Sequence, residues 1–170
     1  MIEYKIGDSG QVLTFSDSVM AHFKRYQQRG SSDDEAGGQL FAKLSEEEIA
    51  IVEVTGPRRS DRRSRYSYVP ERSAEQREIL ERHSKGLQFV GDWHTHPARF
   101  ARPSPQDLAS IAEMVQRSEH SLKGFVLVIV GQAALPSSMY VCVHDGIGAY
   151  ELLSSRKNAG IFTLIARKLR

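Results

Sequence analysis

The chain has 170 residues, of which 40% are hydrophobic and 26% charged, and its formal net charge is only +2. This length and composition suit one globular domain spanning 1–170, and the near-neutral balance excludes a protein that binds nucleic acid or membranes through its overall charge. The single cysteine, Cys142, excludes an internal disulfide. Its apolar neighbours predict a buried structural thiol. The chain shows no signal-peptide pattern and no run long enough to span a membrane, so we expect a cytoplasmic protein.

The first third of the chain predicts a hairpin, a helix and two central strands. Apolar segments at Ile2–Ile6 and Gln11–Phe15 flank a turn-forming GDSG. The stretch 16–30 has apolar residues at helical spacing and ends at a glycine. Strands are expected at Gly37–Leu44 and Glu48–Val54, the second of them rich in β-branched residues.

The middle of the chain predicts a loop, two helices and a strand. The arginine-rich stretch Gly56–Arg65 is polar and turn-prone, so we expect a flexible loop there, before Tyr66–Val69 resumes an extended pattern. A helix is predicted from Ser73 to Gly86, because Ser-x-x-Gln spells a capping box and the glycine a stop. Leu87–Trp93 then reads as a strand, and Ser104–Glu119 as a helix with proline at its first position.

The last third predicts three strands and a terminal helix. The apolar runs 125–131 and Met139–Val143 are strand-like, and a tight turn leads into Tyr150–Leu153. The segment 159–170 is amphipathic, with its cations at its C-terminal end. Together these elements predict a mixed α/β fold in which helices flank a central mixed β-sheet.

The stretch HTHPARFARPSPQD, from His94 to Asp107, carries the pattern of a metal site. In an extended strand, residues i and i+2 point to the same side, so His94 and His96 converge. A catalytic zinc keeps three protein ligands, and Asp107, in the first turn of the next helix, is the natural third. Taken separately, each piece has a simpler explanation: His-x-His as a surface pair, and Ser104-x-x-Asp107 as a helix cap.

A hydrolytic zinc site also needs a base that is not a ligand, and Glu35 is the candidate. It precedes Gly37 and Gly38, which would let the backbone pack closely against the metal-binding loop. Taken alone, Glu35 reads as a solvated acid in a polar loop.

In combination, these residues resemble the JAMM motif of the JAB/MPN metalloproteases, and the resemblance extends over nearly the whole chain. The residues that carry it are Glu35, Gly37, Gly38 and Leu40, then His94-Thr95-His96-Pro97, then Ser104-Pro105-Gln106-Asp107. The resemblance implies a single JAB/MPN domain with cytidine-deaminase-like layering. It also implies one Zn²⁺ held by His94, His96 and Asp107, a water activated by Glu35, and Ser104 holding that water or the oxyanion.

A narrower resemblance, in RSRYSYVPER and FVGDWHTHP, is to the bacterial JAB proteins of mobile elements and CBASS-type antiphage operons. It implies a zinc-dependent isopeptidase that cleaves after the C-terminal residue of a ubiquitin-like modifier or of a conjugated CD-NTase-type protein. The partners would be that C-terminal tail and an operon E1/E2-like conjugating enzyme. The alternative is a peptidase that trims the C-terminal tail of a sulfur-carrier protein with a ubiquitin fold.

Two further readings stay open. The five arginines between Arg58 and Arg65 could neutralise nucleic-acid phosphates, but Asp61 in their midst and the near-neutral chain favour a solvated loop or a contact with an acidic protein. The chain could also be an inert scaffold, against which stands the presence of every motif position.

The remaining histidines and the tryptophan predict structural roles. His22, His83, His120 and His144 have no acidic partner at ligand spacing, so we expect them on the surface. Trp93, next to the predicted ligands, is expected to anchor the core.

Overall fold

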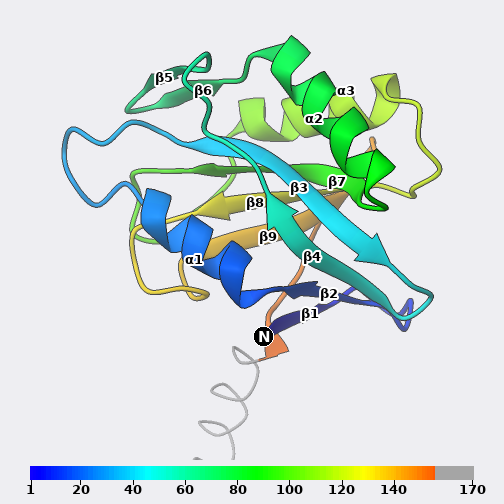
Figure 1. Cartoon of the computed structure of the whole chain (residues 1–170). Helices are drawn as coiled ribbons and strands as arrows, with labels where there is room; N and C mark the ends of the chain where they lie inside the picture. Colours follow the sequence, from blue (N-terminus) through cyan, green and yellow to red (C-terminus); the bar gives the residue numbers. More distant parts are fainter. Residues whose placement is uncertain (156–170) are drawn as a thin grey trace, which may run out of the picture.

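The computed structural model describes residues 1–155, in which eight strands form one curled sheet that carries three helices (Figure 1). The strands of this sheet are β1 (Ile2–Lys5), β2 (Val12–Phe15), β3 (Gly37–Leu44), β4 (Glu48–Val54), β7 (Gln88–Thr95), β8 (Phe125–Val130), β9 (Met139–His144) and β10 (Ala149–Glu151). The helices are α1 (Asp17–Tyr26), α2 (Arg72–Ser84) and α3 (Pro105–Arg117). A separate hairpin consists of β5 (Arg62–Ser64) and β6 (Ser67–Val69).

The sheet is mixed, and its hydrogen-bonded order is β1-β2-β4-β3-β7-β8-β9-β10. The pairs β2–β4 and β7–β8 are parallel and the others antiparallel. The predicted opening hairpin and the two central strands β3 and β4 are confirmed, as is the α/β class. Because β7 and β8 are parallel, the chain must cross over between them, and α3 lies in that crossover.

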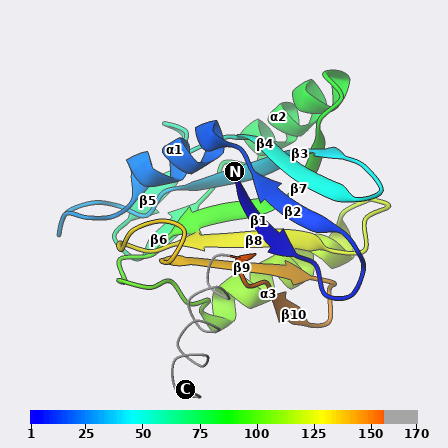
Figure 2. The same cartoon turned by 90° about the horizontal axis from the view of Figure 1, so that it is seen from below.

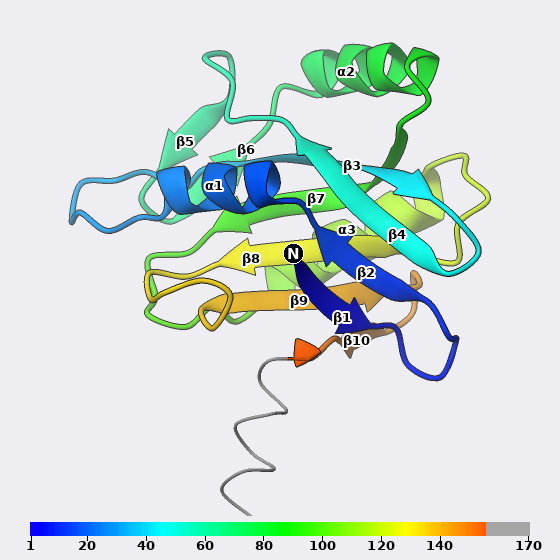
Figure 3. The same cartoon turned by 60° about the horizontal axis from the view of Figure 1, so that its bottom comes forward.

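Alternation along β8 shows how the sheet separates two apolar layers. Phe125, Leu127 and Ile129 pack with residues of α3, such as Ile111, whereas the even-numbered residues of β8 pack in the larger core that includes α1. In Figure 3, α1 lies in front of the strands and α3 behind them. The predicted roles of two residues are confirmed here. Trp93 is 1% exposed in the larger core, and Cys142 is fully buried, which raises the pKa of its thiol to about 11.

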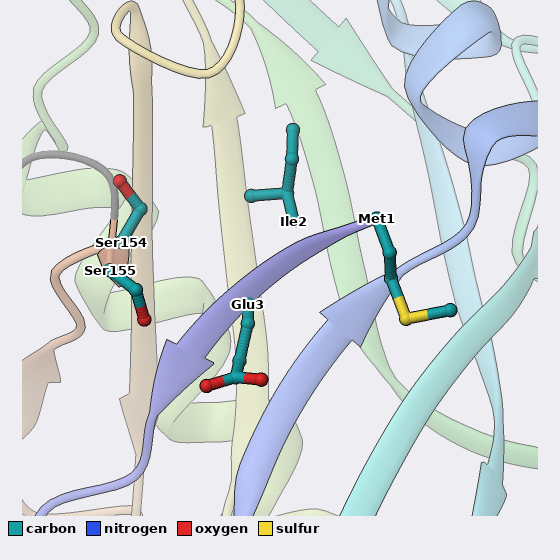
Figure 4. Close-up of a pocket in the computed structure, with 5 residues that line it drawn as sticks. All are labelled: Met1, Ile2, Glu3, Ser154 and Ser155. Carbon is teal, nitrogen blue, oxygen red and sulfur yellow. The ribbon is translucent and has the colours of Figure 1, made fainter.

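The curl of the sheet brings its two ends together (Figure 2). Tyr4 of β1 forms an antiparallel bridge with Ser154, which follows β10, and both residues are buried. Figure 4 shows Ser154 and Ser155 beside Ile2 and Glu3, around a small pocket at this junction. No residue of this pocket belongs to the predicted site.

The second helix begins one residue before the predicted cap, at Arg72, so the assignment of Ser73 as its N-cap is wrong. The carboxylate of Glu71 accepts hydrogen bonds from the backbone N–H groups of Ser73 and Ala74, at 3.0 and 2.9 Å. This carboxylate satisfies two of the free N–H groups of the first turn, and its charge is favoured near the positive end of the helix dipole. Ile79 and Leu80 also predict a modest apolar stripe on this helix, and this prediction is wrong at Leu80, which is 62% exposed.

The arginine-rich stretch is structured, so the expectation of a flexible, irregular loop is wrong for Arg62–Ser64, which form β5. The buried carboxylate of Asp61 accepts hydrogen bonds from the backbone N–H of Arg58 and of Glu71 and from the hydroxyl of Tyr68. These contacts join the segment to β6 and to the start of α2.

The predicted C-terminal helix, 159–170, lies outside the described residues. Within residues 1–155, no helix is both long and apolar enough to cross a membrane.

Candidate functional site

The end of β7 and the first turn of α3 bring His94, His96 and Asp107 together. The Nε2 atoms of the two histidines lie 3.1 Å apart. The carboxylate oxygens of Asp107 lie 3.2 Å from Nε2 of His94 and 3.3 Å from Nε2 of His96. The backbone of His96 is fixed by a 3.0 Å bond from its N–H to the carbonyl of Val130, at the end of the parallel neighbour β8. The three side chains predicted as metal ligands therefore share one point.

These distances fit a tetrahedral zinc. Ligand atoms about 2.0–2.1 Å from zinc at tetrahedral angles lie roughly 3.3–3.4 Å from one another. The 3.1 Å between the two imidazole nitrogens is close to this edge length, and each nitrogen lies at a similar distance from one carboxylate oxygen of Asp107, His94 at 3.2 Å from Oδ1 and His96 at 3.3 Å from Oδ2. The donor types, two imidazole nitrogens and a carboxylate oxygen, are also those of catalytic zinc sites. Among residues 1–155, this is the one group of three or more such side chains close enough to hold a metal ion.

Ser104 fixes Asp107 through a reciprocal cap at the start of α3. The backbone N–H of Asp107 donates to Oγ of Ser104 at 3.1 Å, and the backbone N–H of Ser104 donates to Oδ2 of Asp107 at 2.7 Å. The predicted cap is therefore confirmed. Because the hydroxyl acts as acceptor in this bond, its own hydrogen stays available to another acceptor.

The electrostatics of the three side chains favour a charged carboxylate. Burial alone would raise the pKa of Asp107, but hydrogen bonds from His94 and His96 outweigh it and hold the pKa far below its usual range. Burial would lower the pKa of His96, but the carboxylates of Asp107 and Glu35 outweigh it and raise that pKa. The site thus holds a negative charge ready to balance a cation.

Glu35 is buried beside this group, with 7% of its surface exposed, so the alternative of a solvated acid is wrong. Its N–H donates to the carbonyl of Ser64 at 2.8 Å, and Nε of Arg63 donates to its carbonyl at 2.6 Å. Two residues further, Gly37 pairs with His94 across β3 and β7. Burial raises the pKa of Glu35 to about 7, with a smaller lowering by His96 and a raising by Asp107.

Gly37 allows the predicted close approach to the backbone that carries the metal ligands, next to His94 on β7, whereas Gly38 lies against the end of β4 instead. A Cβ on Gly37 would lie 2.5 Å from the ring of Tyr68 and 2.8 Å from the carbonyl oxygen of Trp93. A Cβ on Gly38 would collide with the backbone of Thr55. The glycines therefore fit the β5–β6 hairpin and the end of β4 against β3.

The surface placement predicted for the other histidines is wrong for His144, which is 4% exposed and accepts a 3.0 Å bond from the N–H of Gly146. His22 is half-buried, with its Nε2 2.8 Å from the carbonyl oxygen of Gly56, and His120 is also half-buried. His83 is exposed as expected. Imidazoles with backbone partners pack inside this fold without an acid.

Sequence reasoning missed the two glutamines that follow α1. Gln27 and Gln28 are 5% and 0% exposed, and their amides bond to loops more than thirty residues away. The sequence pattern that could have pointed to them is a pair of uncharged amide side chains at the end of a helix, shortly before a glycine. Their partners are distant in the chain, so the signal did not say what they bind.

Comparison with known proteins adds three findings. A family model described as "Prokaryotic homologs of the JAB domain" matches residues 18–142. A protein of Pseudomonas aeruginosa named "CD-NTase/cGAS isopeptidase" is 30% identical over 138 residues, covering 79% of this chain and 87% of its own. A protein of Escherichia coli with the same name is 25% identical over 130 residues, covering 75% and 81%.

The fold also matches solved structures. The solution structure of a protein from Desulfitobacterium hafniense superimposes with a TM-score of 0.58 at 18% identity, over 82% of this chain and 88% of that one. This likeness supports the fold class predicted from the sequence.

Proposed function

The chain belongs to the prokaryotic homologs of the JAB domain, and from this premise we propose that it is a zinc-dependent isopeptidase that releases a conjugated CD-NTase-type protein or a ubiquitin-like modifier. It would cleave after the C-terminal residue of that protein and so reverse E1/E2-like conjugation in bacterial antiphage defence. The observation that carries the proposal is the convergence of His94, His96 and Asp107 beside a buried Glu35.

His94, His96 and Asp107 would hold the metal through two imidazole nitrogens and one carboxylate oxygen. When bound, zinc supplies a Lewis acid that polarises the scissile carbonyl and lowers the pKa of water at the site. The low pKa of Asp107 keeps its carboxylate charged without a metal, so this ligand needs no deprotonation on binding.

Glu35 is the proposed proton carrier. With a pKa of about 7, its carboxylate can take a proton from the attacking water and release it to the nitrogen of the leaving lysine amine. A cation among the three ligands would lower this raised pKa, which favours the ionised form that acts as base. Its main chain donates a hydrogen bond to Ser64 and accepts one from Arg63, and these two bonds limit where the carboxylate can go.

Ser104 would stabilise the developing oxyanion. Its oxygen already accepts from the N–H of Asp107, so the free hydroxyl hydrogen can donate to an oxygen at the site. The substrate would be an extended C-terminal tail, which can bind largely through its main chain.

The test is cleavage of a conjugate in which the C-terminus of a CD-NTase-type protein is joined to a lysine side chain of a reporter, using zinc-loaded protein with and without a chelator. The parent should release the reporter, and the chelator should stop it. Glu35→Gln removes the base and no ligand, so it should abolish release while keeping about one zinc per chain. Cleavage by Glu35→Gln at the parental rate would refute the role of Glu35, and cleavage by the metal-free parent would refute the zinc mechanism.

Trimming of a sulfur-carrier tail is the alternative reaction, and the same assay separates the two. In a sulfur-carrier precursor the bond to be cleaved is a main-chain peptide bond, whereas in a conjugate it is an isopeptide bond to a lysine side chain. Faster cleavage of a linear sulfur-carrier fusion than of the lysine-linked conjugate would favour trimming.

A further inference from the structure

We propose that Thr95 and Gln28 are positioning residues that set the place of Glu35 relative to the two histidines. The inference rests on the proposed function, since it assigns Glu35 a catalytic role. Neither residue contacts a substrate in this proposal, and both act through the backbone beside Glu35.

Thr95 lies between the two histidines and binds the residue that follows Glu35 in both directions. Its N–H donates to the carbonyl of Ala36 at 2.8 Å. The N–H of Ala36 donates back to the hydroxyl oxygen of Thr95 at 2.9 Å. Both residues are fully buried, so no water competes for these bonds. The segment that carries Glu35 and the segment that carries the two histidines are therefore joined by a reciprocal pair of hydrogen bonds between Ala36 and Thr95.

Gln28 sets the direction of the Thr95 hydroxyl. The hydroxyl donates its one hydrogen to Oε1 of Gln28 at 2.9 Å, which leaves its oxygen as the acceptor for the N–H of Ala36. A hydroxyl hydrogen can rotate about the C–O bond unless an acceptor fixes it. The fully buried Oε1 of Gln28 is that acceptor for Thr95.

The same amide also binds the loop that precedes Glu35 and the hairpin whose Ser64 accepts the N–H of Glu35. Nε2 of Gln28 donates to the carbonyl of Asp33 at 3.0 Å and to the carbonyl of Arg65 at 2.9 Å. Asp33 precedes Glu35 in its loop, and Arg65 follows β5, whose Ser64 accepts the N–H of Glu35. One buried side chain therefore binds the loop, the hairpin and the histidine strand.

Such an arrangement matters for rate because a misplacement of about 1 Å by a residue remote from the chemistry can cost about 100-fold. Thr95→Val removes the hydroxyl but keeps the branched shape. Gln28→Met removes the amide but keeps the length of the side chain. Both variants should lower kcat by about 10- to 100-fold, with KM and the zinc content unchanged. Thr95→Ser keeps the hydroxyl and should restore most of the rate.

A second readout needs no activity. In Thr95→Val and in Gln28→Met, the N–H of Ala36 should exchange with deuterium faster than in the parent, as followed by NMR. The backbone N–H of Trp93, also on β7, should exchange at the same rate in the variants as in the parent.

Gln27→Met is the matched control. Gln27 is an adjacent buried glutamine whose amide donates to the carbonyls of Gly131 and Ala133, at 2.6 and 2.8 Å. These partners lie in a loop that carries none of the proposed site residues. Gln27→Met should therefore lower Tm about as much as Gln28→Met while leaving kcat at the parental value.

The positioning role is overturned if kcat of Thr95→Val and Gln28→Met falls no further than that of Gln27→Met, or if exchange at Ala36 is unchanged. A parent that fails to cleave any conjugate refutes the proposed function instead. The exchange at Ala36 then decides by itself whether Thr95 and Gln28 fix this segment.

Discussion

Asp107 uses one carboxylate for two tasks, in the helix and in the proposed metal site. Its Oδ2 accepts the N–H of Ser104 at 2.7 Å, and both of its oxygens face histidine nitrogens. The cap thus holds the ligand in place before any metal arrives. Pre-set ligands lower the ordering cost of binding, in the same way that preorganisation helps other binding sites.

Asp107→Asn separates the two tasks. The amide oxygen can still accept from Ser104, so α3 should keep its cap and its helical signal by circular dichroism. The loss of the negative charge should lower the zinc affinity by at least about 10-fold, because even the loss of a residue that only orients a metal ligand typically costs that much. Zinc titration by calorimetry measures this, with Asp34→Asn, an exposed acid, as control. An unchanged zinc affinity would remove Asp107 from the ligand set.

At the scale of elements, the β5–β6 hairpin links the arginine-rich stretch to Glu35. The side chain of Arg58 forms an ion pair with Glu78 of α2, and Arg63 donates to the carbonyl of Glu35. These two cations have partners within the chain, which weakens the reading of this stretch as a phosphate-binding surface. The hairpin is instead a support for the loop that carries the proposed base.

Asp61→Ala should destabilise the protein by about 3 kcal/mol, because three buried or half-buried donors lose their acceptor. Urea unfolding measures the change. Since the hairpin holds Glu35, kcat should also fall under conditions where the variant is fully folded. The control is Arg62→Ala, an exposed residue of the same hairpin, for which we expect a change within about 0.5 kcal/mol. An equal midpoint for Asp61→Ala and the parent would contradict this role.

What the sequence could predict depended on how local each signal is. The strands β4 and β8 follow from runs of apolar and β-branched residues, and the cap of α3 follows from two residues three positions apart. The metal ligands likewise lie within fourteen residues, on a strand end and the next helix. The extended segment predicted at Tyr66–Val69 is confirmed by β6, but its partner β5 was missed because Asp61 organises the hairpin through Tyr68 and Glu71, up to ten positions away. The role of Gln28 was missed because its partner Thr95 is 67 residues away.

At the scale of the whole molecule, two acids are enclosed between α2 and the sheet. Glu75 is 6% exposed and has one ion pair, with Arg72 at 3.3 Å. Oδ1 of Asp92, on β7, is buried and has no hydrogen-bond partner among residues 1–155. Burial raises the pKa of Glu75, although Arg72 and Arg58 lower it in part, and burial followed by the charge of Glu75 raises the pKa of Asp92.

These raised values predict a pH dependence of stability. An acid whose pKa is higher in the folded state binds its proton more tightly there, so its contribution to stability is lost as the pH rises from the unfolded pKa, about 4.3 for glutamate, through the folded one. Glu75→Gln removes this loss. With both proteins saturated with zinc, the free energy of unfolding measured in urea should therefore fall less steeply for Glu75→Gln than for the parent as the pH rises above about 4.3. Parallel curves would contradict the prediction.

The bridge between Tyr4 and Ser154 has a consequence for how copies of the chain meet in solution. An outer strand with free N–H and C=O groups is a template on which a second molecule can add its own strand, and this is a common start of aggregation. At Tyr4, the outer side of β1 already pairs with a residue of the same chain. The fold therefore protects one end of its largest sheet by intramolecular pairing, and intermolecular growth at that position would first have to break the bridge.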